Sequence, residues 1–225
     1  DLLEIETLYA TLPGSEHVTR ELADAVLDEG ARFSEQVLAP LYQSADEEGC
    51  HFDVADGSVR TPQGFKAAYA QWTDNGWAGL TAPEAYGGQN LPETLGSAIK
   101  EMVDAANLAW GNYPLLAHGA TEALKHHGEE WQRDVFLRPI VEGRYTATMC
   151  LTEPHCGSDL GLLQTRAKQE ADDSYTITGT KIFITGGEHD LTDNIIHLVL
   201  ARLPDAPPGS KGISMFIVPK LKVGR

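Results

Sequence analysis

Thr152 to Asp159 read TEPHCGSD, and this stretch lies where a chain of helical character becomes rich in β-branched residues. Pro154 fixes its own φ and Gly157 permits a φ above zero, so we expect a shaped loop that presents hydroxyls and free N–H groups. Loops of this kind either hold small ligands or only connect strands, and the loop's geometry alone does not separate the two.

Upstream of this loop, the apolar residues recur with the spacing of amphipathic helices. We expect helices over residues 17–43 with a bend or end near Pro40, over 65–75, from Pro92 to about 108, over 114–127 and over 129–141.

Downstream of Gly143 the chain consists of short β-branched or aromatic runs between Gly, Pro, Asp and Asn. The strand candidates are residues 145–151, 175–178, 181–185, 195–202 and 213–218. Helices followed by strands predict an α-helical N-terminal domain, residues 1–143, and a β domain, residues 144–225. Because the chain stops directly after a strand candidate, we expect the β domain to be incomplete.

The charge balance argues against two classes of partner. The 17 basic and 33 acidic residues give a formal net charge of −16, which repels nucleic acid and anionic membranes. No apolar run has the length of a membrane span, and the acidic start lacks the basic residues of a signal peptide. Three cysteines do not make a disulfide framework, so a cytoplasmic location is expected.

Several familiar motifs are absent. Cys150 and Cys156 do not have zinc-ligand spacing, and we expect no metal site. The segment GTKIFITGG is no dinucleotide fingerprint, and Ser158 lacks the GxSxG context of a hydrolase. Two polar segments remain, 152–159 and 181–187. They are either two β-hairpin loops or a grip on a flat heteroaromatic ligand, with Ile182, Phe183 and Ile184 as apolar cover.

Four segments resemble the acyl-CoA dehydrogenase family. TATMCLTEPHCGSD, residues 146–159, resembles a strand that ends in T-E-P-x-A-G-S-D, with Cys156 in place of alanine. YTITGTKIFITGG, residues 175–187, resembles the family's Y-x-I-x-G-x-K-x-[WF]-I-T-[NS]-[GA]. LTAPEAYGGQNLP, residues 80–92, and HHGEEWQRDVFLRPIVEG, residues 126–143, resemble a loop and a helix that precede these in the family. The order of the four segments also matches.

The resemblance implies an FAD enzyme that removes the α proton and β hydride of an acyl-CoA thioester, giving the trans-2-enoyl-CoA. It implies a helical N-terminal domain, a β-barrel-like middle domain and a helical C-terminal domain that is absent here, in a homodimer or homotetramer. Electrons would pass to an electron-transfer flavoprotein. Residues 193–220 look like the larger bacterial members, the 3-methylmercaptopropionyl-CoA and broad-range fatty acyl-CoA dehydrogenases.

The same resemblance implies seven cofactor contacts, from Met149, Leu151, Thr152, Gly157, Ser158, Phe183 and Thr185. Met149, Leu151 and Thr152 would lie along the isoalloxazine, with the Thr152 hydroxyl on its pyrimidine edge. Gly157 and Ser158 would approach the pyrophosphate, and Ser158 would also approach the pantetheine of the substrate. Phe183 would cover one side of the flavin. Thr185 would bond near N5 or O4.

No catalytic residue is assigned in this chain. The base, by resemblance a glutamate, is expected beyond Arg225, so residues 1–225 alone are expected to fold but to be inactive. Glu153 is expected to fix its turn through backbone N–H groups. Two alternatives remain: an acyl-CoA oxidase that uses O₂, and a non-catalytic DNA-binding relative whose basic groove would have to come from another segment.

Overall fold

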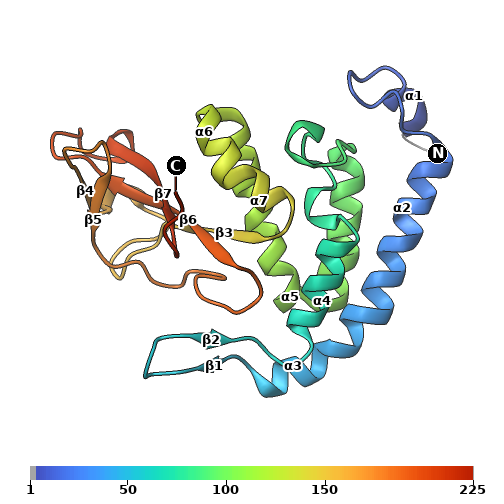
Figure 1. The fold of residues 1–225 in the computed structure, drawn as a ribbon, viewed down its shortest axis with the longest axis horizontal. Helices are drawn as coiled ribbons and strands as arrows, with labels where there is room; N and C mark the ends of the chain where they lie inside the picture. Colours follow the sequence, from blue (N-terminus) through green and yellow to red (C-terminus); the bar gives the residue numbers. More distant parts are fainter. Residues whose placement is uncertain (1–3, 225) are drawn as a thin grey trace.

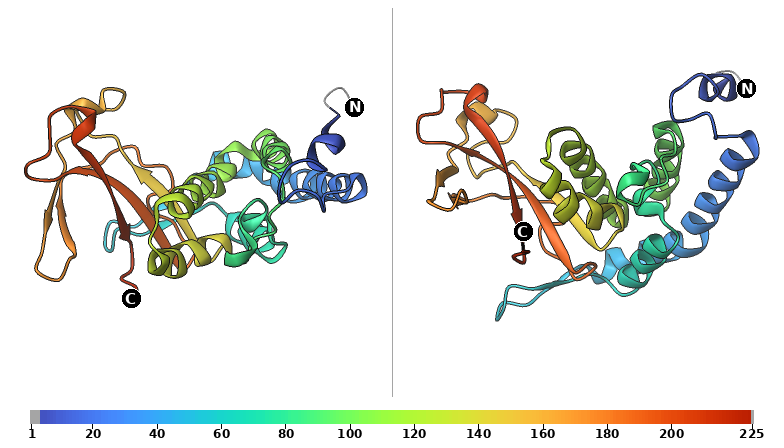
Figure 2. Two further views of the ribbon diagram at one scale, coloured as in Figure 1. Left: turned by 90° about the horizontal axis from the view of Figure 1, so that it is seen from above. Right: turned by 45° about the horizontal axis from the view of Figure 1, so that its top comes forward.

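A helical domain is followed by a β-sheet in the computed structural model, which describes residues 4–224 (Figure 1). The helices are α1 (Ile5–Tyr9), α2 (Arg20–Phe33), α3 (Tyr42–Glu48), α4 (Phe65–Asp74), α5 (Glu93–His127), α6 (Glu130–Gln132) and α7 (Arg138–Val141). The helical bundle and the sheet lie side by side (Figure 2). Within the described residues, no helix combines the length and the apolar character that a membrane span requires.

The first long helix begins later and ends later than its periodicity predicts. The Thr19 side chain accepts a hydrogen bond from the N–H of Leu22, so Thr19 caps the start of α2. A π-helical turn and a 3₁₀ turn containing Pro40 then carry the chain into α3. This run ends at Gly49, whose φ of 68° suits glycine. The bend expected at Pro40 is therefore present as a change of helix type.

The two helices expected over 92–108 and 114–127 form one element, α5, that is broken at Asn107. Asn107 has φ −161° and ψ 86°, and its side-chain oxygen accepts the N–H of Trp110. The side chain thus caps the second half of α5, while its amide donates to the carbonyl of Leu38. Pro114 lies inside the second half, so the break comes from Asn107 rather than from the proline.

An aromatic cluster forms the core of the helical domain. Trp110 is fully buried, and its ring centroid lies 5.6 Å from that of Trp72 and 5.8 Å from that of Phe33. Its indole N–H donates to the carbonyl of Phe65, so the buried polar atom is satisfied. This cluster holds α2, α4 and α5 together.

The β domain is a five-stranded mixed sheet built from β3 (Tyr145–Cys150), β4 (Arg166–Gln169), β5 (Tyr175–Thr178), β6 (Asn194–Arg202) and β7 (Ile213–Pro219). The central strand β6 pairs in parallel with β3 and, at Arg202, with β4; it pairs antiparallel with β7. The sheet is open over the described residues, so the expected barrel-like domain is not a closed barrel here.

One strand prediction is wrong, and three strands were not predicted. Residues 181–185 read as a strand but form a loop, because Phe183 adopts a φ of 55° that interrupts an extended backbone. The polar strand β4, RAKQ, shows no apolar alternation and was not predicted. The hairpin of β1 (His51–Phe52) and β2 (Val59–Arg60) was also missed, since strands of two residues carry no periodicity.

The sheet packs on the helical domain through a second core. Leu137 and Ile140 of the segment before β3 lie against Ile196 and Leu198 of β6, and all four are at least 98% buried. This packing fixes the carboxyl end of β3 beside α5, and the stretch TEPHCGSD begins there. We propose the domain division between residues 143 and 144, where α7 gives way to β3.

Candidate cofactor site

The two polar segments singled out in the sequence lie side by side. The N–H of Ile182 donates to the carbonyl of Thr152 at 3.0 Å, and Lys181 Nζ donates to the carbonyl of Leu151 at 3.0 Å. From within β3, Thr148 Oγ1 donates to the carbonyl of Thr185 at 2.6 Å. The loops that were expected to converge therefore do so, about 30 positions apart in sequence. The contacts that Lys181 and Thr148 make between the loops were not predicted from the sequence.

All seven residues predicted to contact the cofactor are at least partly exposed. The hydroxyls of Thr152, Ser158 and Thr185 have no hydrogen-bond partner within residues 4–224, although they stand on loops that are otherwise well bonded. Phe183 is 89% exposed and holds a left-handed backbone that is rare for a bulky residue. Strain of this kind gathers at ligand sites, so the arrangement fits a molecule that is both flat and polar-edged.

Gly157 corrects one expectation and supports another. Its φ lies outside the left-handed region, so the turn does not depend on the freedom of glycine. The turn is closed instead by Glu153 and Cys156, whose backbones exchange two hydrogen bonds of 2.8 and 3.1 Å. A Cβ at Gly157 would meet only Thr152, at an ordinary distance of 3.5 Å. The fold therefore tolerates a side chain here, and the space above Gly157 fits the close approach of a pyrophosphate.

The Glu153 side chain connects the two loops through its hydrogen bonds. Its Oε1 accepts from Lys181 Nζ at 2.9 Å and from the N–H of Thr165 at 3.0 Å, and its Oε2 accepts from the N–H of Gln164 at 2.8 Å. Burial alone would raise the pKa of Glu153, but the hydrogen bonds from Thr165, Gln164 and Lys181 outweigh it and lower the pKa to about 2. The lowered pKa favours the carboxylate form of Glu153, which accepts hydrogen bonds from backbone N–H groups, as expected from the sequence.

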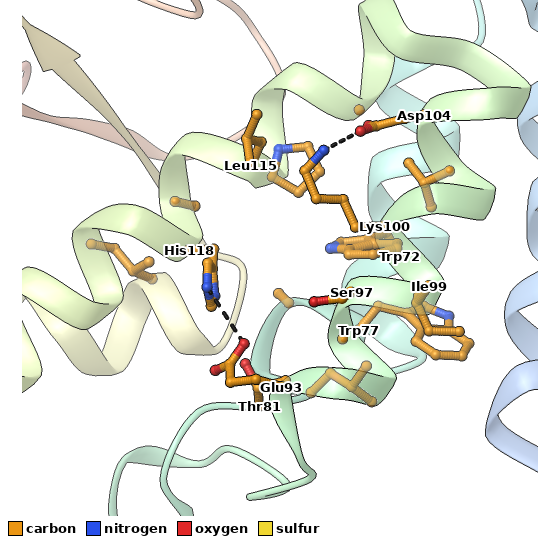
Figure 3. A pocket seen from close by; sticks show the side chains of 18 of the residues that line it. Trp72, Trp77, Thr81, Glu93, Ser97, Ile99, Lys100, Asp104, Leu115 and His118 are labelled. Atoms are coloured by element: carbon orange, nitrogen blue, oxygen red, sulfur yellow. Dashed lines mark hydrogen bonds and ion pairs between the residues drawn. The ribbon is translucent and has the colours of Figure 1, made fainter. Parts of the chain in front are cut away.

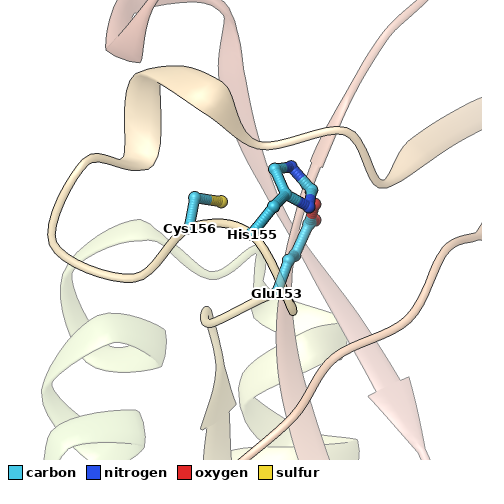
Figure 4. Close-up of side chains that lie close together, drawn as sticks. All are labelled: Glu153, His155 and Cys156. Atoms are coloured by element: carbon cyan, nitrogen blue, oxygen red, sulfur yellow. The ribbon is translucent and has the colours of Figure 1, made fainter.

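Glu153, His155 and Cys156 lie close enough to suggest a metal site (Figure 4). Their potential ligand atoms are within 4.8 Å of one another. However, both oxygens of Glu153 are already engaged, one of them by an ammonium group, and His155 Nε2 lies 3.0 Å from the carbonyl of Leu162. A cation here would have to displace the lysine, so the cluster is better explained as the support of the turn.

Buried His189 lies on the segment that follows the second loop. Its Nδ1 accepts the N–H of Leu191 at 3.1 Å, so the neutral ring carries its proton on Nε2 and donates to Thr146 Oγ1 at 2.8 Å. Burial is the main cause that lowers the pKa of His189 to about 4. Protonation would place a hydrogen on Nδ1, so that two N–H donors would face each other and the hydrogen bond from Leu191 would be lost.

We expect His189 to make the protein acid-sensitive. Between about pH 6.5 and pH 4 the unfolded chain takes up a proton at this residue that the folded chain does not, so stability falls as the pH is lowered. His189→Gln should reduce the loss of unfolding free energy between pH 7 and pH 4.5 by about 2 kcal/mol in urea titrations. The exposed His17→Gln is the control. An unchanged pH dependence in the His189 variant would contradict the neutral, buried state.

The helical domain contains a mostly apolar cavity of about 130 Å³ between α4 and the two halves of α5 (Figure 3). Trp72, Ile99 and Leu115 line it. Beside it lie the ion pair of Lys100 with Asp104 and the contact of His118 Nε2 with Glu93 Oε2 at 3.6 Å. The volume is close to that of engineered cavities that bind benzene, so the space suits a short hydrocarbon portion of a ligand. No sequence motif pointed to this cavity.

Comparisons with known proteins agree with this architecture. Residues 20–144 match the family model for the acyl-CoA dehydrogenase N-terminal domain, and residues 148–225 match the one for the middle domain. A 3-methylmercaptopropionyl-CoA dehydrogenase of Ruegeria pomeroyi is 46% identical over 202 residues, which are 90% of this chain and 34% of that protein. The broad-specificity linear acyl-CoA dehydrogenase FadE5 of Mycobacterium tuberculosis is 38% identical over 201 residues, 89% of this chain and 33% of that protein.

Among solved structures, the butyryl-CoA dehydrogenase of Megasphaera elsdenii superposes with a TM-score of 0.74 at 26% identity, covering 91% of this chain and 49% of that one. The chain therefore belongs to the acyl-CoA dehydrogenase family, as its four motifs predicted. It spans about a third of the length of the two curated relatives.

Proposed function

We propose that this chain forms the helical and middle domains of an FAD-dependent acyl-CoA dehydrogenase, which converts an acyl-CoA thioester to the trans-2-enoyl-CoA. The observation that carries the proposal is the convergence of the two loops. Three hydroxyls on these loops have no hydrogen-bond partner among residues 4–224, Phe183 is exposed, and an added Cβ at Gly157 would meet only Thr152. Family membership supplies the reaction class, and the free groups on the loops fit the cofactor.

In this proposal each loop residue has a separate task. Thr152 and Thr185 donate hydrogen bonds to the polar edge of the flavin, and Phe183 covers one face beside Met149 and Leu151. Gly157 and Ser158 meet the pyrophosphate. Bound FAD would supply the acceptor for the β hydride. The contacts of Glu153 and Thr148 hold the loops that carry the Thr152 and Thr185 hydroxyls. Donors held in place in this way would stabilise the negative charge of a reduced flavin without having to move first.

The base that removes the α proton is proposed to lie outside the described residues. Glu153 is the carboxylate within the loop TEPHCGSD that is buried, but its pKa of about 2 suits a fixed anion rather than a proton acceptor. A dehydrogenase base instead needs a desolvated pocket that raises the pKa of the carboxyl toward neutrality. The helical cavity beside Leu115 is proposed to receive the distal part of the acyl chain.

The proposal extends to partners. Electrons are proposed to pass to an electron-transfer flavoprotein, in a cytoplasmic homodimer or homotetramer of the complete gene product. An acyl-CoA oxidase of the same fold is the alternative, and it differs in letting O₂ reach the reduced flavin.

The decisive test is flavin chemistry in the complete gene product. We expect the purified protein to show the visible absorption of bound FAD, which saturated acyl-CoA thioesters bleach under nitrogen. Air should restore the colour slowly and an electron-transfer dye rapidly. Rapid reoxidation by air with release of peroxide would favour the oxidase, and a protein that binds no flavin would refute both assignments.

A further inference from the structure

The loop between β5 and β6 carries Phe183 and Thr185 and then runs to the helical domain (Figure 1). Two of its carbonyls are held from within the sheet: that of Thr185 by Thr148 Oγ1, and that of Gly187 by His197 Nε2 at 2.9 Å. These contacts fix the loop to the β domain only. Its position relative to the helices has to come from other residues.

Asp190 supplies a link to the helical domain. Its Oδ1 accepts hydrogen bonds from the N–H of Thr61 at 2.9 Å and from Thr61 Oγ1 at 2.8 Å, across 129 positions of sequence. Thr61 directly follows β2 and is only 4% exposed. Burial would raise the pKa of Asp190, but the two bonds from Thr61, with the nearby charge of Lys66, outweigh it and lower the pKa. Two charge-assisted bonds therefore cross the boundary between the domains.

A second contact from the helical domain lies on the same loop. Tyr113 of α5 packs edge-on against the ring of His189 at 5.2 Å between centroids. The Tyr113 ring also lies beside Gly186, where an added Cβ would stand 3.4 Å from Tyr113 Cδ1. The loop is thus touched from the helical side directly after Thr185 and again at Asp190. Residues at the edge of the candidate site are held between two domains.

We propose that Asp190 is a positioning residue for the flavin loop, and this proposal rests on the proposed function. Through Thr61 it fixes Phe183 and Thr185 relative to the helical domain, where the acyl chain is proposed to bind. The helical domain would then set the position of the flavin loop and also bind the acyl chain. This would fix the distance between the flavin and the thioester. A purely structural role would hold the domains together without changing how the loop meets the flavin.

The test uses the complete gene product and measures FAD affinity well below the melting temperature. Asp190→Ala should raise the FAD dissociation constant about tenfold, because both bonds from Thr61 are lost. Thr61→Val keeps the N–H and loses the hydroxyl, so a smaller increase is expected. Thr61→Ser retains both donors and should bind FAD like the wild type. The visible circular dichroism of the bound flavin should change in the same order.

Thr19→Ala is the matched control, since it removes the cap of α2 and weakens the helical domain without touching the loop. It should lower the melting temperature and leave the FAD dissociation constant unchanged. If Asp190→Ala behaves like this control, Asp190 is structural only and the proposal is wrong. A wild-type protein that binds no FAD would overturn the proposed function and this proposal with it, whereas wild-type affinity in Asp190→Ala would overturn this proposal alone.

Discussion

Glu153→Gln is expected to lower the free energy of unfolding by about 3 to 5 kcal/mol, the range observed when one partner of a buried ion pair is removed. The Glu153 side chain is 3% exposed and that of Lys181 is 11% exposed, so the lysine would keep a buried charge opposite a neutral amide. The amide N–H₂ would also face one of the backbone N–H groups that now donate to the carboxylate. Urea titration at pH 7 measures the loss.

The pH dependence of this loss follows from the lowered pKa. Because the pKa of Glu153 falls from about 4.5 in the unfolded chain to about 2 in the folded one, its stabilisation is fully present above pH 4.5. It disappears as the pH falls toward 2. The gap in stability between the wild type and Glu153→Gln should therefore narrow over that interval. A gap that stays constant down to pH 2.5 would mean that the carboxylate charge is not what stabilises the turn.

A surface pair provides the comparison. Glu142→Gln breaks an ion pair with Arg144 at 2.7 Å in which both side chains are more than a third exposed, and it should cost less than about 1 kcal/mol. Combining Glu153→Gln with Lys181→Met should recover part of the loss, because the uncompensated ammonium is removed. If the double variant loses the full sum of the two single losses, Glu153 and Lys181 do not act as a pair.

The order of helices and strands could be predicted from the local spacing of apolar residues. The buried pair Leu137 and Ile140 has helical spacing, and the buried pair Ile196 and Leu198 has the spacing of one strand face. The contact between the two loops could not be read in this way. It was inferred from resemblance to a family, and its physical cause is a lysine that reaches back across 28 positions to Glu153. No sequence spacing predicts that Lys181 and Glu153 are in contact.

Other differences arise where a single residue overrides a pattern. Residues 181–185 have strand composition, yet the left-handed Phe183 breaks the extended run. The sequence pattern predicted a helix end at about residue 108, next to the break at Asn107, but it did not indicate that the Asn107 side chain caps the second half of α5. The link from Asp190 to Thr61 lies 129 positions apart and is invisible to any local window. Local sequence thus predicts elements, while the site depends on side chains that join distant ones.

Gly157→Val is expected to raise the FAD dissociation constant about a hundredfold while leaving the free energy of unfolding within about 0.5 kcal/mol of the wild type. The backbone at Gly157 lies outside the left-handed region, and an added Cβ meets only Thr152 at 3.5 Å, so the protein itself does not require glycine here. The valine would instead occupy the space in which the pyrophosphate is proposed to approach the backbone. Flavin titration and urea unfolding on the same preparation separate the two effects.

Two other glycines serve as controls, one where an added side chain has free space and one where it would clash with the backbone. An added Cβ at Gly119 on α5 meets nothing within 4 Å, so Gly119→Val should change neither FAD affinity nor folding by much. At Gly88 the Cβ would stand 2.0 Å from the carbonyl oxygen of Ala82, and Gly88→Ala should unfold the loop after η4 (Glu84–Tyr86). If Gly157→Val behaves like Gly119→Val, the open space above Gly157 is not where the cofactor binds, because a ligand in contact with that backbone cannot tolerate the added side chain.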